Sequence, residues 1–254
     1  MVTITSLDNK IIKDLVKLHE TKYRRAKKSF LAEGLRCVET FLKAGSVLEH
    51  FFVTEEQTQT ALHLGVLEEQ ITILSDPVML KVSQASTPSG ILAQFRLPTA
   101  PFVNTLSHGL VLAQIQDPGN MGTLIRTAIA LQVNHIVILS GSTDPWSYKA
   151  IQASAGALAY AKIYEIDLER LIAHKKNNIL LGLVVSGGKT PQEILRTNSL
   201  KNTYVMVGSE AHGLTQEQVD LCDIRMTLPM PSGQIESLNA AVAGALALYL
   251  LQEN

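Results

Sequence analysis

Leu228-Pro-Met-Pro-Ser-Gly-Gln-Ile-Glu-Ser-Leu-Asn239 runs into Ala240-Ala-Val-Ala-Gly-Ala-Leu-Ala-Leu-Tyr-Leu-Leu251, and this stretch decides the fold. Its first half cannot be regular structure, because Pro229 and Pro231 fix φ and remove two backbone donors. Its second half predicts a helix over 238–251 that is apolar on nearly every side. Such a helix is buried or spans a membrane, and this run is shorter than the roughly 20 apolar residues of a span. We therefore expect a buried helix.

Two polar residues, Ser237 and Asn239, lie where this loop becomes the helix. A helix start leaves backbone N–H groups without partners, so the loop presents backbone and side-chain hydrogen bonders together. Such an arrangement is typical of a ligand site. The alternative is a plain docking helix that Ser237 caps.

Composition indicates an ordinary globular protein. The chain has 254 residues, of which 46% are hydrophobic and 18% charged, with a net charge of −1. No overall positive charge indicates a nucleic-acid partner, so any such binding must come from a local patch. The two cysteines, Cys37 and Cys222, form no CxxC pair and favour a reducing cytoplasm. The first residues lack the apolar core of a signal peptide, and nothing else resembles a membrane segment.

Short strands and helices alternate over residues 1–100 and predict a small α/β unit. A linker with Pro98 and Pro101 follows, and we place the boundary near residue 100. The expected helices cover 8–19, 34–44, 55–62 and 77–82, and the expected strands cover 30–33, 50–53, 71–74 and 91–95.

Five of the seven residues in Lys22-Tyr-Arg-Arg-Ala-Lys-Lys28 are basic. Charge runs are usually solvated connections between elements. Alternatively, these side chains contact RNA phosphates, with Tyr23 available for stacking. On that reading the RNA-binding candidates are Arg24, Arg25, Lys27 and Lys28.

Residues 101–254 alternate more strictly between apolar strands and helices, which predicts βαβ units and a parallel sheet with helices on both sides. The expected strands cover 110–115, 135–139, 163–166, 179–185, 204–207 and 224–228. Ligands of open parallel sheets bind beyond the carboxyl ends of the strands. Segments at 116–126, 186–188, 208–213 and 229–239 follow four of these strands, and three of the four concentrate glycine with Asn, Ser or Glu. Their gathering at one edge predicts a site.

Several common sites are missing from these loops. The chain has no G-x-G-x-x-G turn after a strand, no phosphate-binding loop that ends in Gly-Lys-Ser/Thr, and no G-x-S-x-G elbow. Its seven histidines show no metal-ligand spacing, so we expect no metal.

Three of the loops together resemble the SpoU-type RNA methyltransferases of the SPOUT superfamily, which are TrmH-like enzymes that methylate ribose 2′-hydroxyls in tRNA or rRNA. The motifs are similar to Asp117-Pro-Gly-Asn120-Met-Gly-Thr-Leu-Ile-Arg126, Gly208-Ser-Glu210-Ala-His-Gly213 and Leu228-Pro-Met-Pro-Ser-Gly233-Gln-Ile-Glu-Ser237-Leu238-Asn239. The resemblance covers residues 108–251. More loosely, residues 1–96 look like the substrate-binding domain that often precedes it, similar to RNA-binding ribosomal proteins. Gln152 departs from the family pattern, in which arginine is frequent.

The resemblance implies a parallel-sheet α/β catalytic domain over 101–254 with a trefoil knot, S-adenosylmethionine as cofactor, and a homodimer. It also implies site roles. Gly208, Leu228 and Leu238 would line the cofactor pocket, and Ser237 and Asn239 would hold the methionine end or the ribose. Glu210 would contact the nucleoside or brace Asn120, which would orient Arg126 or the target ribose. The catalytic set is therefore Arg126, Asn120, Glu210 and Asn239.

Arg126 would reach toward the partner's cofactor. Because arginine stays protonated, we expect Arg126 to anchor a phosphate and stabilise the developing alkoxide rather than act as a base. Each residue also has an ordinary structural explanation: strand termination for Gly208, helix capping for Ser237 and Asn239, a surface carboxylate for Glu210, and a helix-face ion pair for Arg126. His212 lies in a position that the motif leaves free, and we expect it at the surface.

The resemblance thus implies an S-adenosylmethionine-dependent 2′-O-methyltransferase of structured RNA, with rRNA favoured over tRNA. The alternative is a non-catalytic RNA-binding or assembly protein that retains the fold. A third possibility, another nucleotide-dependent α/β enzyme, is disfavoured by the missing phosphate loops.

Overall fold

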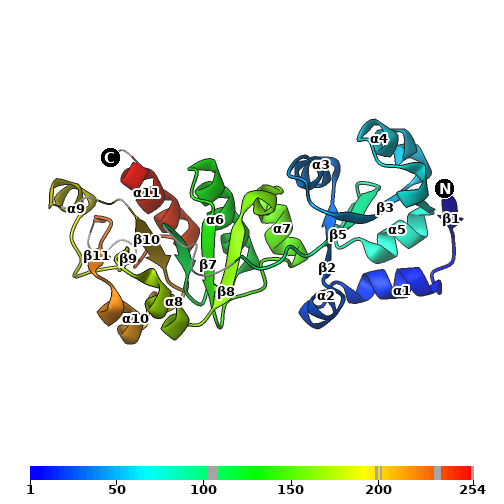
Figure 1. Cartoon of the computed structure of the whole chain (residues 1–254). Helices are drawn as coiled ribbons and strands as arrows, with labels where there is room; N and C mark the ends of the chain where they lie inside the picture. Colours follow the sequence, from blue (N-terminus) through cyan, green and yellow to red (C-terminus); the bar gives the residue numbers. More distant parts are fainter. Residues whose placement is uncertain (102–107, 198–199, 201, 232–235, 253–254) are drawn as a thin grey trace. The chain divides into compact units, whose positions relative to one another are not determined.

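The computed structural model describes residues 1–101, 108–197, 200, 202–231 and 236–252. The chain divides into two compact units (Figure 1). The first contains Met1–Thr99 and Asp144–Ala159, and the second contains Ala100–Thr143 and Tyr160–Asn254. Across the described ranges, the helices are too short or too polar to cross a bilayer.

The first unit is built on a mixed five-stranded sheet in the order β1-β4-β3-β5-β2. Strand β5 runs antiparallel to both of its neighbours, β2 and β3, whereas β4 runs parallel to β1 and β3. The strands are β1 (Val2–Ile4), β2 (Ser29–Glu33), β3 (Leu48–Val53), β4 (Ile71–Leu74) and β5 (Ile91–Arg96). The α/β prediction for this region is confirmed, although β1 was not expected.

Apolar stripes on short helices cover this sheet. Ile12 and Leu15 of α1 (Lys10–Lys17) are buried in one cluster with Phe52 and Leu74. Phe30 of β2, Phe41 of α3 (Leu35–Lys43) and Phe95 of β5 form an aromatic group, with ring centres 5.1 to 5.7 Å apart. The remaining elements are η1 (Glu55–Gln57), α4 (Thr58–His63), η2 (Glu68–Gln70) and α5 (Asp76–Val82).

The basic run is a helix rather than a connection. Helix α2 spans Thr21–Lys27 and ends at Lys28, whose φ of 53° is left-handed. Charged residues can form this helix because one of them, Arg24, turns inward and is buried. The helix was missed because its sequence carries almost no apolar period.

The second unit is built on a fully parallel six-stranded sheet, and the predicted parallel sheet is thus confirmed. The strands lie in the order β11-β9-β10-β6-β7-β8. All residues of β6, β7 and β10 are buried, which accounts for their continuous apolar runs. The strands are β6 (Gly109–Leu112), β7 (His135–Leu139), β8 (Lys162–Ile166), β9 (Ile179–Leu183), β10 (Thr203–Val207) and β11 (Ile224–Met226).

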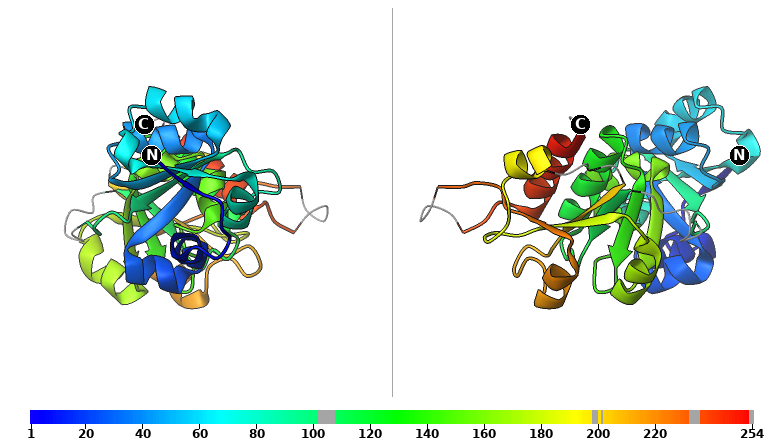
Figure 2. Two further views of the ribbon diagram at one scale, coloured as in Figure 1. Left: turned by 90° about the vertical axis from the view of Figure 1, so that its right-hand side faces the viewer. Right: turned by 60° about the vertical axis from the view of Figure 1, so that its left-hand side comes forward.

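Helices cover both faces of this sheet (Figure 2). Leu171 of α8 (Leu168–Lys175) and Leu221 of α10 (Gln216–Leu221) pack on the face that contains Val111 and Tyr204. On the other face, α6 (Pro118–Ala130) and α11 (Ala240–Gln252) pack against each other. Helix α9 (Pro191–Thr197) also contacts α11. Between β7 and β8 the chain forms α7 (Tyr148–Ser154), which contacts β2 and belongs to the first unit, and η4 (Ala157–Tyr160).

Strand β10 lies between β6 and β9, although it follows both in sequence. Because the sheet is parallel, the segments that follow β6, β9, β10 and β11 all leave it at one edge. This order brings the three sequence motifs to the same edge. Residues 232–235, which include Gly233 of the third motif, lie outside the described residues.

Helix α11 is buried on one side only, so the prediction of burial all round is wrong for a single chain. A Cβ on Gly244 would overlap Leu124 of α6 and lie 3.1 Å from Val207, so glycine allows this close packing. The opposite side exposes Val242, Leu246 and Tyr249, at 48%, 43% and 56%. These three residues are spaced i, i+4, i+7 and therefore form one apolar stripe.

Candidate active site

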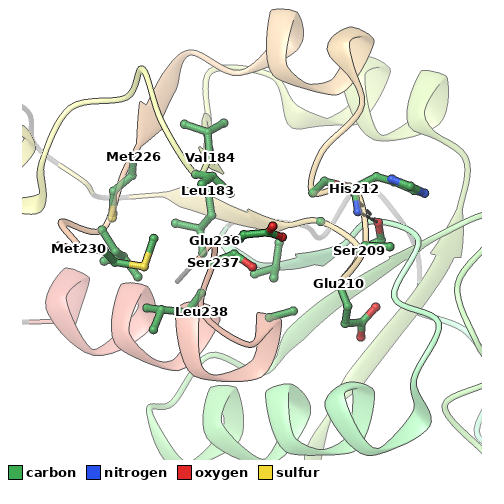
Figure 3. Close-up of a pocket in the computed structure, with 18 residues that line it drawn as sticks. Leu183, Val184, Ser209, Glu210, His212, Met226, Met230, Glu236, Ser237 and Leu238 are labelled. Carbon is green, nitrogen blue, oxygen red and sulfur yellow. Dashed lines mark hydrogen bonds between the residues drawn. The ribbon is translucent and has the colours of Figure 1, made fainter. Parts of the chain in front are cut away.

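A cavity of about 290 Å³ opens at the edge where β9, β10 and β11 end and α11 begins (Figure 3). Gly208, Leu228, Ser237 and Leu238, the four predicted cofactor-binding residues, all line it. Other apolar side chains form much of the remaining wall, namely Leu183, Val184, Val185, Val207, Met226, Met230, Ala240 and Ala243. The structure thus brings the second and third motifs together around one hollow.

Gly208 is required by its own loop. The segment 208–213 folds back on itself, and the backbones of Ser209 and Gly213 exchange two hydrogen bonds of 3.1 and 3.0 Å. A Cβ on Gly208 would overlap the backbone of Gly213 and Leu214. Because backbone cannot move aside as a flexible side chain can, only glycine permits this tight turn, which forms one wall of the cavity.

Three side chains that are remote in sequence form a hydrogen-bonded network beside the cavity. Asn120 Nδ2 donates to Glu210 Oε1 at 2.7 Å, and Asn239 Nδ2 donates to Asn120 Oδ1 at 3.1 Å. The hydrogen bond between Glu210 and Asn120 is the contact that a bracing role for Glu210 requires. Glu210 and Asn239 are exposed, so the network remains accessible to a ligand.

Helix starts hold two members of this network in place. Asp117 caps α6 by accepting the backbone N–H of Asn120 at 2.7 Å, with Pro118 at the first helical position. Asn239 Oδ1 accepts the N–H groups of Ala241 and Val242 at the start of α11. Asn239 therefore caps α11 and contacts Asn120 at the same time. Ser237 is exposed, lines the cavity, and is not the cap.

The cavity is acidic. The ionisable side chains that line it are Glu210, Glu236 and His212, and no lysine or arginine is among its described lining residues. Carboxylates without nearby cations favour a positively charged ligand and disfavour a phosphate. Figure 3 shows Glu236 beside Ser237 in the middle of the hollow, between the methionine side chains and Glu210.

Two residues of the cavity were not anticipated from the sequence. Glu236 was not selected, although it lies inside the third motif, one residue before Ser237. His212 is exposed, as expected, but it also lines the cavity rim, and its backbone N–H lies 3.3 Å from Ser209 Oγ. Both lie next to motif residues at strand ends, which is the signal that could have identified them.

Arg126 lies apart from this arrangement. It is exposed on α6 and does not line the cavity. Its side chain forms no ion pair with any residue in the described ranges, so the interpretation as a helix-face ion pair within one chain is not supported. Asn120 and Arg126 are six positions apart on one helix, and this spacing turns them toward different sides.

Arg24 is not available to RNA, and its prediction as an RNA-binding residue is wrong. Only 3% of Arg24 is exposed, and its guanidinium pairs with Asp144 at 2.6 Å. Arg25, Lys27 and Lys28 are exposed together with Lys22. The ammonium groups of Lys17 and Lys22 each lie 6.0 Å from the Tyr23 ring centre.

Neither thiol is suited to nucleophilic chemistry. Burial raises the pKa of Cys37 to about 12 and that of Cys222 to about 11, so both remain protonated at neutral pH. Within the described ranges, no group of His, Cys, Asp and Glu side chains is arranged to hold a metal ion. The chemistry of the site is therefore that of amide and carboxylate groups beside an acidic cavity.

Comparison with known proteins gives matches over the whole chain. The SpoU rRNA Methylase family matches residues 107–249, and the MRM3-like substrate binding domain matches residues 9–93. The 23S rRNA (guanosine(2553)-2′-O)-methyltransferase RlmP of Bacillus subtilis (strain 168) is 30% identical over 255 residues, which cover 99% of this chain and 100% of that protein.

Solved structures give the same result for the fold. An RNA 2′-O ribose methyltransferase is 28% identical with a TM-score of 0.81, and the match covers 99% of this chain and 98% of that one. An AdoMet-bound rRNA methyltransferase from Sinorhizobium meliloti superimposes with a TM-score of 0.86 at 24% identity, covering 99% and 97% of the two chains. The predicted α/β fold class with a parallel sheet is confirmed, whereas its trefoil knot stays a prediction.

Proposed function

The chain belongs to the SpoU rRNA methylase family, and we propose on that premise that it transfers a methyl group from S-adenosylmethionine to a ribose 2′-hydroxyl of structured RNA, with rRNA favoured over tRNA. The observation that carries the proposal is the network of Asn120, Glu210 and Asn239 beside an acidic cavity. The AdoMet-bound structure of the rRNA methyltransferase from Sinorhizobium meliloti supports the choice of cofactor. The 2′-O activity named for RlmP supports the ribose 2′-oxygen as the methyl acceptor.

The cavity fits the proposed cofactor in charge and in polarity. S-adenosylmethionine carries a sulfonium and an ammonium group, which suit the carboxylates of Glu210 and Glu236. Its adenine suits the apolar wall that includes Leu228 and Leu238. Gly208 and Ser237 add backbone and hydroxyl groups for its polar edges. When bound, the cofactor supplies a methyl group on a good leaving group, so the protein must chiefly align the acceptor oxygen.

The polar network is the part of this chain that can align a ribose. Asn120 and Asn239 present amide groups, and Glu210 holds Asn120 in one orientation. Arg126 remains protonated, so we assign it electrostatic stabilisation of the developing alkoxide and contact with an RNA phosphate. In this scheme Asn120, Glu210, Asn239 and Arg126 are the catalytic set.

We propose a homodimer because Arg126 lies outside the cavity of its own chain. A second copy would bring its Arg126 to this cavity. The stripe of Val242, Leu246 and Tyr249 on α11 offers an apolar surface for that copy. The trefoil knot and the division into a substrate domain over 1–100 and a catalytic domain over 101–254 stay predictions.

RNA binding is assigned to the exposed basic residues of the first unit. Lys22, Arg25, Lys27 and Lys28 lie on or next to α2 and are accessible, with Tyr23 among them. The matched substrate binding domain at residues 9–93 supports this assignment. A cytoplasmic location is part of the same proposal, since rRNA and its methyl donor meet there.

The primary test combines calorimetry with nucleoside analysis. We expect S-adenosylmethionine to bind the purified protein, and we expect one 2′-O-methylated nucleoside to disappear from rRNA when the gene is deleted. Wild-type protein should restore it, whereas Asn120→Ala should not. Absence of heat at millimolar cofactor together with unchanged rRNA would instead favour the non-catalytic assembly protein.

The source of the arginine can be tested by complementation. Arg126→Ala and Glu210→Ala should each be inactive alone. Mixed and reassembled at equal amounts, half of the dimers carry both variants, and one of their two sites is intact if the arginine comes from the partner. The mixture should therefore recover about a quarter of wild-type activity. No recovery in demonstrably mixed dimers would contradict an arginine lent by the partner.

A further inference from the structure

The segment between β7 and β8 belongs by its contacts to the first unit. Residues Asp144–Ala159 follow β7 in sequence, yet they group with Met1–Thr99. The chain therefore passes between the units three times, after Thr99, after Thr143 and after Ala159. The passage at 143–144 lies only two residues after Gly141, in the loop that follows β7.

One buried ion pair secures this passage. Arg24 Nε and Nη2 both donate to Asp144 Oδ2, at 3.0 and 2.6 Å. The other donors of the guanidinium bind the carbonyls of Leu18 and His19 and the hydroxyl of Thr21, at 2.7 to 2.8 Å. All five N–H groups of Arg24 are thus used. The exposed fractions of the two side chains are 4% and 8%, so water cannot replace either partner.

The residues after Asp144 make further contacts within the first unit. Asp144 Oδ1 accepts the backbone N–H of Trp146 at 2.9 Å, and the Trp146 ring lies 4.8 Å from the ring of Phe30. Gln152 of α7 donates from Nε2 to the carbonyl of Glu33 at 2.8 Å. An arginine would not reproduce this bond with the same geometry. Trp146 is the single tryptophan of the chain and is buried, so it reports on this segment spectroscopically.

The residues before Asp144 hold the loop of the first motif. The N–H of Thr143 donates to the carbonyl of Ile115 at 2.8 Å, and Gln116 Nε2 donates to the carbonyl of Gly141 at 2.6 Å. Asp117, the cap that positions Asn120, follows Gln116 directly. A continuous path of printed bonds and chain therefore runs from Arg24 through Asp144 and residues 141–143 to Asn120.

We propose that Arg24 and Asp144 are positioning residues for the methyl-transfer site: their ion pair fixes residue 144, and thereby the loop 141–143 and the first-motif loop that carries Asn120. Arg24 lies on α2, the same helix as Arg25 and Lys27. RNA that binds this helix would therefore contact the element from which the path to Asn120 begins. This inference rests on the proposed function. It predicts that loosening the pair disorders the acceptor side of the site while the cofactor cavity stays intact, because the lining of that cavity follows β9, β10 and β11.

The test uses the full chain with Asp144→Asn, which keeps the shape and the acceptor for the Trp146 N–H but removes the charge. We expect Trp146 emission to shift to longer wavelength and to become more open to acrylamide quenching. We also expect the side-chain amide resonance of Asn120 to broaden or move. The Kd for S-adenosylmethionine should stay within about twofold, whereas kcat should fall by on the order of 100-fold, as expected for misplacement of reacting groups.

Two controls separate positioning from general damage. Glu39→Gln removes one carboxylate from the exposed Lys43–Glu39 pair of the same unit and should change none of these readouts. Val82→Ala shortens a buried side chain in α5 and retains the Val82 carbonyl that contacts His19. It should lower the unfolding temperature while it leaves kcat near wild type. If Asp144→Asn fails to fold, Arg24→Lys, which retains the charge but loses the fork, serves with the same readouts.

The outcomes distinguish the inference from the function on which it rests. Unchanged kcat and an unchanged Asn120 resonance in a folded variant whose Trp146 emission has shifted would overturn the positioning role. An equal loss of kcat in Val82→Ala at equal destabilisation would overturn it as well. Absence of cofactor binding and methylation in the wild type would defeat the proposed function instead, and the Asn120 resonance would still test the path.

Discussion

Two polar clusters of this protein each join residues that are about equally far apart in sequence, and they differ in their access to water. Arg24 and Asp144 are separated by 120 positions and are buried, with exposed fractions of 4% and 8%. Asn120 and Asn239 are separated by 119 positions, and their cluster with Glu210 is exposed. The comparison teaches that burial, rather than residue type, separates a structural cluster from one that can bind a ligand.

The two clusters also differ in how many hydrogen-bonding groups remain available to a ligand. Arg24 uses all five of its donors within the chain, so it has nothing left to offer a ligand. Glu210 binds Asn120 through one carboxylate oxygen, and within the described part of the chain the other oxygen has no partner. A buried charge without its partner is costly, whereas an exposed one is solvated by water. Substitutions in the first cluster should therefore lower stability and disturb the site only indirectly, whereas those in the second should lower activity with little loss of stability.

The largest expected effect is on stability, from Asp144→Ala. Removal of one partner from a buried, hydrogen-bonded pair leaves Arg24 uncompensated and should lower the free energy of unfolding by about 3–5 kcal/mol. Urea unfolding followed by circular dichroism measures this loss. Asp220→Ala, in the exposed Arg225–Asp220 pair, is the matched control and should cost about 0–1 kcal/mol. Equal losses in the two variants would remove the distinction between the clusters.

The next effect is on catalysis, from Asn120→Ala and Glu210→Ala. Loss of one preorganised polar group at a reacting centre typically lowers the rate by about 10²–10³-fold. Because the cluster is exposed, the unfolding free energy should change by no more than about 0.5 kcal/mol in Glu210→Ala. Single-turnover methylation of rRNA measures the rate. Large destabilisation with little loss of rate would show that this cluster is structural after all.

A smaller effect, on RNA binding, is expected at the exposed basic residues on and next to α2. Lys27→Gln with Lys28→Asn removes two exposed charges, and asparagine tolerates the left-handed backbone at position 28. The slope of log Kd for RNA against log salt concentration should decrease by roughly 1–2. Glu39→Gln with Lys43→Gln, at the exposed ion pair of α3, is the control and should leave the slope unchanged. An unchanged slope in the first variant would exclude α2 from the RNA contact.

Much of the architecture followed from periodicity in the sequence. The strands of the parallel sheet were predicted because continuous apolar runs are needed where both faces are covered, as in β7 and β10. The four cavity residues followed from motif positions at strand ends. Helix α2 was missed because its polar sequence has little apolar period, and its stability depends on the inward-facing Arg24.

Other features depend on partners that a sequence does not reveal. The inward turn of Arg24 requires an aspartate 120 positions away, so the local pattern Lys-Tyr-Arg-Arg could not separate Arg24 from Arg25. The half-exposed α11 was expected to be buried all round because Val242 and Leu246 are as apolar as the residues that face the core. In each case the missing information is which surface meets which, and that is a property of the whole fold.

The smallest effect concerns pH, and it extends the comparison to histidine rings that belong to neither cluster. Burial lowers the pKa of His19, His50 and His135, and the Val82 carbonyl partly opposes this shift at His19. The unfolded chain therefore binds more protons than the folded one just below the unperturbed histidine pKa of about 6.5, so stability is complete above that pH and declines as the pH falls.

We accordingly expect the unfolding temperature to decrease by a few degrees between pH 7 and pH 5. His135→Gln should make that decrease smaller, because it removes a ring that is paired with the buried Tyr164 hydroxyl and resists protonation. Differential scanning calorimetry at fixed ionic strength measures the profile, and exposed His63→Gln is the control. A profile that is flat, or that rises toward pH 5, would mean that these histidines are protonated in the folded chain. The charge of Arg24 adds to the lowering of the His19 pKa, so Arg24 contributes to this profile through His19.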